Sequence, residues 1–175
     1  MKGKRTELSA NDCAIARSLD VIGDWWSLLI IRDARSGKRR FSEFQRNLGM
    51  ARNILATRLK KLVERGIMEM APASDGSAFK EYVLTDKGER LFVVIVALWQ
   101  WGEESCFGPD ELRFAMVDVH TGEPLARLKV QTESGKRIGA RDFQLVARSV
   151  ETASSGADRA LPRSGQRRQQ SVAAK

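Results

Sequence analysis

The chain has 175 residues, of which 42% are hydrophobic and 30% are charged, so it can bury a core and is not disordered throughout. No apolar run reaches the roughly 20 residues that a membrane-spanning helix needs, and the basic N-terminus lacks the apolar stretch of a secretion signal. The two cysteines are too few for a disulfide framework. We therefore expect a cytoplasmic protein with no membrane partner.

The net charge of +8 is unevenly distributed along the chain. Residues 1–66 contain 15 Lys and Arg against 7 Asp and Glu, whereas residues 67–110 contain 3 against 8. A basic half beside an acidic segment favours a surface that attracts polyanions, and nucleic acid is the obvious polyanion in the cytoplasm. The alternative is an ordinary solvated surface with a chance excess of positive charge.

The first part of the chain predicts a flexible basic arm over residues 1–10 and then two helices. The first helix is expected to begin near Ser9–Asn11 and to end at Ile22. Asp24 is placed to cap the second helix, which ends near Gly37 because glycine terminates helices easily.

A short third helix and a longer basic helix follow. Ser42 and Gln45 have the spacing of a capping box, which predicts a helix that ends near Leu48. After the turn at Gly49, residues 51–65 predict a helix with an apolar stripe and a basic opposite side, and the stripe consists of Leu55, Leu59 and Leu62. Two helices joined by a short glycine turn are typical of a helix-turn-helix.

The next segment predicts a β-hairpin and an apolar helix. Residues 67–84 alternate loosely on both sides of the turn signal Ser74–Ser77, which indicates a wing after the recognition helix. Thr85 is expected to cap a helix over residues 86–106. Its nine consecutive apolar residues, 91–99, favour a homodimer contact, although the C-terminal segment of the same chain could cover them instead.

The C-terminal third predicts a small β-rich module over residues 107–150 and a disordered tail over residues 151–175. Three short strands are expected at residues 112–119, 123–131 and 136–146, with turns at Thr121–Gly122 and Ser134–Gly135. The tail has no aromatic residue and cannot bury enough apolar area to offset its ordering. The fold class is therefore mainly α with a small β component.

Several spaced motifs between residues 12 and 106 resemble the HxlR-type branch of MarR-like winged-helix regulators. They are CAIARSLDVIGDWWSLLIIRD, RRFSEF, RLKKLVERG, EYVLTDKGERL and ALWQWGEE. The resemblance implies a homodimeric bacterial transcription factor that associates with the nucleoid through DNA and pairs through its terminal helices. Ala51 departs from the Ser or Thr that family members commonly carry there. Residues 136–146 resemble a zinc-ribbon-like module without its cysteines, so we expect no metal.

The candidate DNA contacts lie on the predicted recognition helix and near the wing. We predict major-groove contacts from Arg52, Asn53, Thr57, Lys60 and Lys61. Arg58 is expected to hold a phosphate or an internal acid, Arg39, Arg40 and Ser42 to hold the DNA backbone, and Lys80 to lie near the minor groove. For each residue the alternative is a merely solvated side chain.

The predicted dimer interface is formed by apolar residues of the first and last helices, namely Ile15, Leu19, Leu91, Val94, Ile95, Leu98, Trp99 and Trp101. Cys13 is a candidate redox sensor, since the resemblance permits it and a helix N-terminus lowers a thiol pKa. The alternative for Cys13 is a small apolar residue in the first turn of the helix.

Enzymatic function is not expected. The single histidine, His120, lies in a strand–turn segment, and the sequence has no nucleophile triad, metal-ligand spacing or glycine-rich phosphate loop. The sequence therefore predicts a homodimeric regulator of double-stranded DNA that needs no cofactor and whose small-molecule effector is unknown. The alternative is a winged-helix module that binds a protein partner without specific DNA binding.

Overall fold

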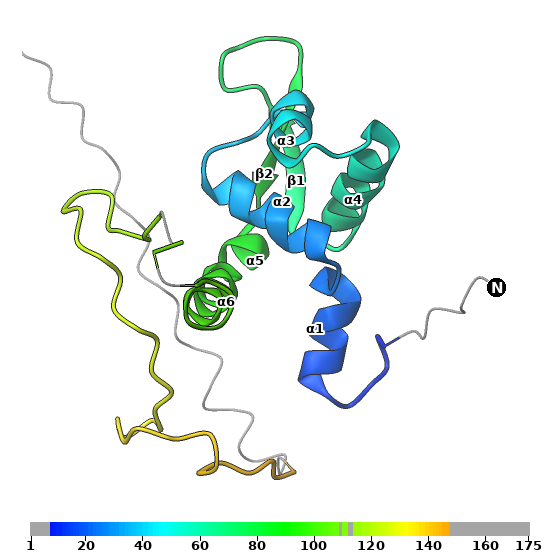
Figure 1. Cartoon of the computed structure of the whole chain (residues 1–175). Coiled ribbons are helices and arrows are strands. Elements are labelled where there is room, and N and C mark those ends of the chain that lie inside the picture. The colour runs from blue at the N-terminus through cyan, green and yellow to red at the C-terminus, as the bar shows by residue number, and fades with distance from the viewer. Residues whose placement is uncertain (1–7, 109, 112–113, 148–175) are drawn as a thin grey trace, which may run out of the picture. The chain divides into compact units, whose positions relative to one another are not determined.

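The structure, a computed structural model, describes residues 8–108, 110–111 and 114–147 and divides into two compact units, one up to Leu128 and one from Lys129. The helices and strands of the first unit follow the order of the sequence (Figure 1). They are α1 (Ala14–Ile22), α2 (Trp25–Arg35), α3 (Phe41–Leu48), α4 (Arg52–Glu64), β1 (Met68–Pro72), β2 (Lys80–Leu84), α5 (Asp86–Glu89) and α6 (Phe92–Ser105). The α+β winged-helix fold is confirmed.

The core forms where α2, α3 and α4 meet the start of β1. The predicted stripe of α4 is confirmed, because Leu55, Leu59 and Leu62 are all 0% exposed. Ile30 of α2 and Phe44 of α3 are equally buried beside them. Burying one such side chain contributes about 1.5–3 kcal/mol, so this stripe fixes both the position and the rotation of α4.

The corner between α1 and α2 is held by Gly23 and Asp24. A Cβ at Gly23 would lie 2.3 Å from the carbonyl oxygen of Leu19, so only glycine fits there without a shift of the backbone. The predicted cap of α2 is confirmed, since an oxygen of Asp24 accepts from the Ser27 amide at 3.0 Å. The α1 helix begins later than predicted, at Ala14, because the Asn11 side chain accepts from the Cys13 amide in the turn before it.

The capping box predicted for α3 from Ser42 and Gln45 is wrong. The helix begins at Phe41, and the carboxylate of Glu43 accepts from the backbone amides of Arg39 and Arg40, both at 2.8 Å. Glu43 takes this role because it is the third helical residue, from which a long acidic side chain reaches back to the amides before the helix. Ser42 is left exposed on the surface.

The helix-turn-helix and the wing form as predicted. Gly49 ends α3 in the left-handed region at φ 62°, which makes the tight turn into α4. Strands β1 and β2 are antiparallel, with Met68 opposite Leu84 and Pro72 opposite Lys80. The Tyr82 amide donates to the carbonyl of Arg39 at 2.8 Å, which joins the wing to the segment before α3.

The single helix predicted over residues 86–106 is interrupted at Arg90 and Leu91. Its first turn, α5, packs closely against Ile67, the residue before β1. A Cβ at Gly88 would lie 2.2 Å from the carbonyl oxygen of Ile67, so the close approach requires glycine. The cap at Thr85 is confirmed, since its hydroxyl accepts from the Gly88 amide at 3.2 Å. In the part of the chain that the structure describes, no helix is long and apolar enough to cross a bilayer.

The three strands predicted after α6 are reduced to two isolated β-bridges, Val117 with Pro124 and Gln131 with Arg137, within the described residues 114–147. The turns between them form as predicted, with positive φ at Gly122 and Gly135. Isolated bridges result because these segments bury almost no side chain that could hold a sheet together.

The first compact unit also extends beyond the boundary that we predicted at residue 107. The Gln100 amide donates to the carbonyl of Ala126 at 2.9 Å, and its oxygen accepts from the Leu128 amide at 2.8 Å. These bonds join residues 126–128 to α6. The predicted tail and most of the predicted N-terminal arm lie outside the described residues.

Asp24 is a stability residue that can be tested directly. Besides the Ser27 amide, it accepts from the Ser27 hydroxyl at 2.6 Å and lies 3.3 Å from Nε of Arg58. We expect Asp24→Ala to lower the free energy of unfolding by about 2 kcal/mol, because the cap is lost and two polar groups lose their partner.

Denaturant unfolding followed by circular dichroism measures this change. Asp12→Ala removes an exposed acid in front of α1 and serves as the control, with an expected change within about 0.5 kcal/mol. Equal stabilities of the two variants would contradict the role assigned to Asp24.

Candidate nucleic-acid interface

The exposed side of α4 is polar and basic. Arg52, Asn53, Thr57 and Lys60 are all exposed. Asn53, Thr57 and Lys60 lie on the side of the helix opposite the buried leucines, whereas Arg52 precedes Leu55 by three residues and lies at the N-terminal end of the helix. Lys60 has a side chain that is 77% exposed and lies 3.7 Å from Glu64, one turn further on. Three of the five major-groove candidates therefore share one accessible face, and Arg52 is exposed at the N-terminal end of the helix.

The first turn of α4 is open at its end. Ala51 occupies the position before the helix, and no side chain accepts from the first turn in the manner of an N-cap. The side-chain oxygen of Asn53 accepts from the adjacent Ile54 amide at 2.9 Å, and the guanidinium of Arg52 lies over the Phe41 ring at 5.4 Å. Uncapped amides at a helix N-terminus are suited to an anion such as a phosphate.

Two of the predicted contacts point into the protein instead. Arg58 is half-buried beside Asp24, which corresponds to the internal acid that we considered for it. Lys61 donates to the carbonyl oxygen of Asp20 at 3.1 Å, so it contacts the end of α1 and leaves the predicted groove face. The cause is tertiary packing, because the end of α1 lies beside this side of α4, where Asp20 also pairs with Arg65 at 2.8 Å.

The basic residues before α3 are tied to the wing by acids that the sequence analysis did not single out. The carboxylate of Glu81, whose side chain is 5% exposed, lies 3.7 Å from both Arg39 and Arg40. Arg40 also pairs with Asp75 at the turn of the wing. The burial of Glu81 is a property of the fold, because the same residue at an outward-facing strand position would lie in water. The sequence alone therefore offered no clear signal for this acid.

This acid–arginine network leaves cationic surface on the outer side. The Arg39 side chain is 52% exposed, and Ser42 and Lys80 are exposed near it. Hydrogen bonds from Ser77 and the Arg40 guanidinium lower the pKa of Asp75 to about 2. The wing turn and the N-terminus of α3 are therefore held together by groups that stay charged at neutral pH.

A second surface of the protein is apolar. Exposed hydrophobic side chains lie on α1 (Ile15 and Leu19) and on α6 (Phe92, Val93, Val94, Leu98 and Trp101). Phe92 and Val93 were absent from the predicted dimer residues. Ile95 is only 9% exposed and packs in the core of its own chain, which removes it from that surface. Leu91 and Trp99 are half-buried.

The two cysteines are exposed and lie far apart in the sequence, Cys13 directly before α1 and Cys106 directly after α6. The redox role suggested for Cys13 stays a prediction. Within the described ranges, no group of three or more His, Cys, Asp and Glu side chains could hold a metal ion.

Comparison with known proteins identifies the family. The model of the HxlR-like helix-turn-helix family matches residues 21–108. This chain belongs to the HxlR-like helix-turn-helix family. An uncharacterized HTH-type transcriptional regulator of Mycobacterium tuberculosis is 38% identical over 129 residues, which cover 74% of this chain and 82% of the relative. The regulator YybR of Bacillus subtilis is 30% identical over 53% of this chain and 75% of its own length.

Solved structures share the fold of this HxlR-like chain. PA1607, a candidate transcription factor, is 48% identical, with a TM-score of 0.77 over 82% of this chain and 100% of that protein. The candidate transcription factor PA1374 of Pseudomonas aeruginosa is 37% identical, with a TM-score of 0.55 over 79% and 94%. Both matches extend well beyond the helix-turn-helix, which indicates that part of the C-terminal segment is shared as well.

The lowered pKa of Asp75 leads to a prediction about pH. Its carboxylate is ordinarily protonated below about 3.8, whereas in the folded chain it stays charged down to about 2. Because the pKa of Asp75 is lower in the folded chain, its charged carboxylate stabilises the wing turn at pH values above about 4. This contribution is lost as the pH falls from about 4 to about 2. NMR titration of the Asp75 carboxyl group measures both values.

Two substitutions separate the causes of this shift. Arg40→Gln should bring the pKa of Asp75 closer to 3.8 because it removes the guanidinium, whereas Ser77→Ala should change it less, because the backbone amide of residue 77 still donates to Asp75 at 3.0 Å. Arg46→Gln, which changes another arginine of α3, should leave the titration unchanged. A wild-type pKa near 3.8 would contradict the hydrogen-bonded turn.

Proposed function

We propose that this protein is a homodimeric transcriptional regulator that binds specific sequences of double-stranded DNA. The observation that carries the proposal is the exposed face of α4, formed by Arg52, Asn53, Thr57 and Lys60, next to a wing with its own basic residues. In winged-helix regulators of known type, a helix in this position enters the major groove.

The residues of this face offer the chemistry that reads base edges. Arginine pairs with two acceptors of guanine, and asparagine pairs with the donor and acceptor of adenine. Arg52 and Asn53 occupy the first turn of α4, where the uncapped amides can also donate to a phosphate. The N-terminal half of α4 is therefore proposed to carry both the sequence preference and a backbone anchor.

The wing is proposed to hold the DNA backbone beside the recognition helix. Lys80, Arg39 and Arg40 supply positive charge there, and Ser42 supplies a hydroxyl. Asp75 and Glu81 hold Arg39 and Arg40 in place before DNA arrives. A phosphate would compete with these carboxylates for the guanidinium groups, which predicts strong dependence of the affinity on salt.

Dimerisation is proposed to occur through α1 and α6. Their exposed apolar side chains form a surface of the kind that soluble proteins cover with a partner. A two-fold axis there would present two copies of α4 to successive major grooves, about 34 Å apart on a pseudo-palindromic site. The dimer residues retained in this proposal are Ile15, Leu19, Val94, Leu98, Trp99 and Trp101. Leu91 is half-buried and lines the cavity described below, so it is not retained.

One observation favours the alternative of a protein-binding wing. Phe79 is 70% exposed and Met70 is 48% exposed, so the wing displays two large apolar side chains beside its basic residues. Such side chains are typical of protein contacts. The DNA experiment below separates the two functions, because only the proposed regulator needs the basic face of α4.

The basic face is tested by the double variant Arg52→Ala, Lys60→Ala. We expect its affinity for the promoter DNA of its own gene to fall at least about tenfold and the slope of log affinity against log salt to decrease by about 1 to 2. Electrophoretic and fluorescence-anisotropy titrations at several salt concentrations measure both quantities.

The matched control is Arg90→Ala with Lys136→Ala, which removes the same charge at exposed positions that do not belong to α4. The control should bind like the wild type. Unchanged DNA binding by the double variant on α4, with a preserved circular dichroism spectrum, would reject the assigned surface and favour the protein-binding alternative.

The dimer is tested by Trp101→Glu, which places a charge on a side chain that is 61% exposed in one chain. If α6 lies at the interface, burial of this charge is unfavourable and the variant should sediment as a 19.6 kDa monomer. Met70→Glu, an exposed apolar position on the wing, is the control and should remain a dimer. If Trp101→Glu remained a dimer like Met70→Glu, the result would contradict this interface.

A further inference from the structure

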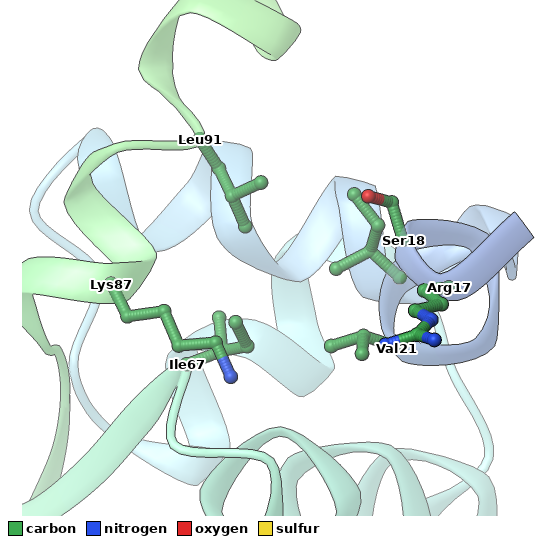
Figure 2. Close-up of a pocket in the computed structure, with 7 residues that line it drawn as sticks. Arg17, Ser18, Val21, Ile67, Lys87 and Leu91 are labelled. Carbon is green, nitrogen blue, oxygen red and sulfur yellow. The ribbon is translucent and has the colours of Figure 1, made fainter. Parts of the chain in front are cut away.

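An open cavity of about 280 Å³ lies between α1, the start of β1 and the segment from α5 to α6. Figure 2 shows Leu91, Val21 and Ile67 directed toward a common space, with Lys87 and Arg17 on opposite sides of it. The volume is close to the lower end of about 300 Å³ that is typical of ligand pockets. The cavity therefore suits a small molecule.

The walls of the cavity define the body of such a molecule. Its apolar lining consists of Val21, Ile22, Ile67 and Leu91 and contains no aromatic ring. Ile22 and Ile67 belong to the buried core, so this side of the cavity is rigid. A compact aliphatic group would bury apolar area against these side chains.

The rim of the cavity defines the charge of the molecule that it would bind. Two of the lining residues, Arg17 and Lys87, are cationic, and none of the lining residues is acidic. Both cations retain donors for a ligand, since among the described residues Arg17 engages its Nε with the carbonyl of Asn11 and its two NH₂ groups stay available, and an ammonium has three donors. We propose that this cavity binds a small carboxylate with a compact aliphatic body.

The same residues connect the cavity to the end of the recognition helix. Lys87 donates to the carbonyl oxygen of Arg65, the residue that ends α4, at 2.8 Å. Arg65 in turn pairs with Asp20 of α1 at 2.8 Å. The last turn of α4 is thus held by two walls of the cavity, α1 and α5.

A bound carboxylate would neutralise Lys87 beside this carbonyl group. A cation at the C-terminus of a helix stabilises the helix dipole, so its neutralisation loosens the last turn of α4. In combination with the proposed function, on which this step depends, the ligand would lower the affinity for DNA. Ligand binding itself requires no DNA and can be measured separately.

The probe for the cavity is cyclohexanecarboxylate, with its amide, cyclohexanecarboxamide, as the neutral control of the same shape. We expect the carboxylate to shift amide signals of residues around Val21, Ile67 and Leu91 in NMR titrations of the full chain, and to bind at least about tenfold more tightly than the amide. Lys87→Gln and Arg17→Gln should each weaken the carboxylate severalfold. Arg90→Gln, which removes a nearby cation outside the cavity, should not.

Three results would overturn the site. They are equal binding of the amide and the carboxylate, unchanged binding by both Lys87→Gln and Arg17→Gln, and no shift of these signals up to about 10 mM probe. The last result would include the case in which a second copy of the chain fills the cavity. Melting curves of the variants exclude unfolding as the cause of a loss.

The connection to α4 is tested by hydrogen exchange without DNA. Saturating cyclohexanecarboxylate should accelerate exchange of the amides in the last turn of α4, residues 61–64, and leave those of α3 unchanged. Unchanged exchange in α4 despite binding would overturn the connection. If the Arg52→Ala, Lys60→Ala variant loses DNA binding and still binds the probe normally, the ligand site uses residues other than the DNA contacts, as we expect. The two proposals can therefore fail separately.

Discussion

The structure depends on the burial of one side of α4. Leu55, Leu59 and Leu62 are fully enclosed by α2, α3 and the start of β1, and a helix buried on one side can rotate about its axis only at the cost of exposing that side. The position of the polar residues on the opposite side then follows from helical geometry alone. No separate interaction is needed to point Asn53 and Thr57 outward, because the leucines have already set the direction.

Ion pairs with acids decide which basic residues remain available on the surface. Asp24 holds Arg58 and Asp20 holds Arg65, while Glu81 and Asp75 hold the arginines before α3 close to the wing. The excess of positive charge in the first 66 residues therefore overstates the charge offered to a ligand. A paired arginine inside a protein serves packing and orientation, since breaking such a pair leaves an uncompensated charge.

The sequence was a good guide to periodic and local features. The leucine stripe, the cap at Asp24, the turn at Gly49 and the wing turn depend on residues within one or two turns of chain, and all of them formed as predicted. The partners of Arg58 and Lys61 could not be predicted, because Asp24 and Asp20 lie more than 30 residues away and meet them only in the fold. The cavity between α1 and α5 was unpredictable for the same reason. The strands after α6 were predicted from alternation alone, which cannot tell whether a neighbouring surface exists to bury one face.

The interruption at Arg90 and Leu91 separates α5, which is attached beside the wing, from α6, which carries the exposed apolar side chains. α5 is fixed beside the wing at Gly88, where the carbonyl oxygen of Ile67 approaches too closely for any larger residue, whereas α6 begins after the break at Arg90 and Leu91 and packs on the core through Ile95. A helix of 14 residues is about 21 Å long, so a bend of about 10° at its base moves its far end by nearly 4 Å. In the proposed symmetric dimer, such a bend of α6 would change the distance between the two α4 helices and leave the structure of each winged helix unchanged. Substitutions at this joint would then give related proteins a way to match DNA sites of different spacing while they keep the residues proposed to contact the bases.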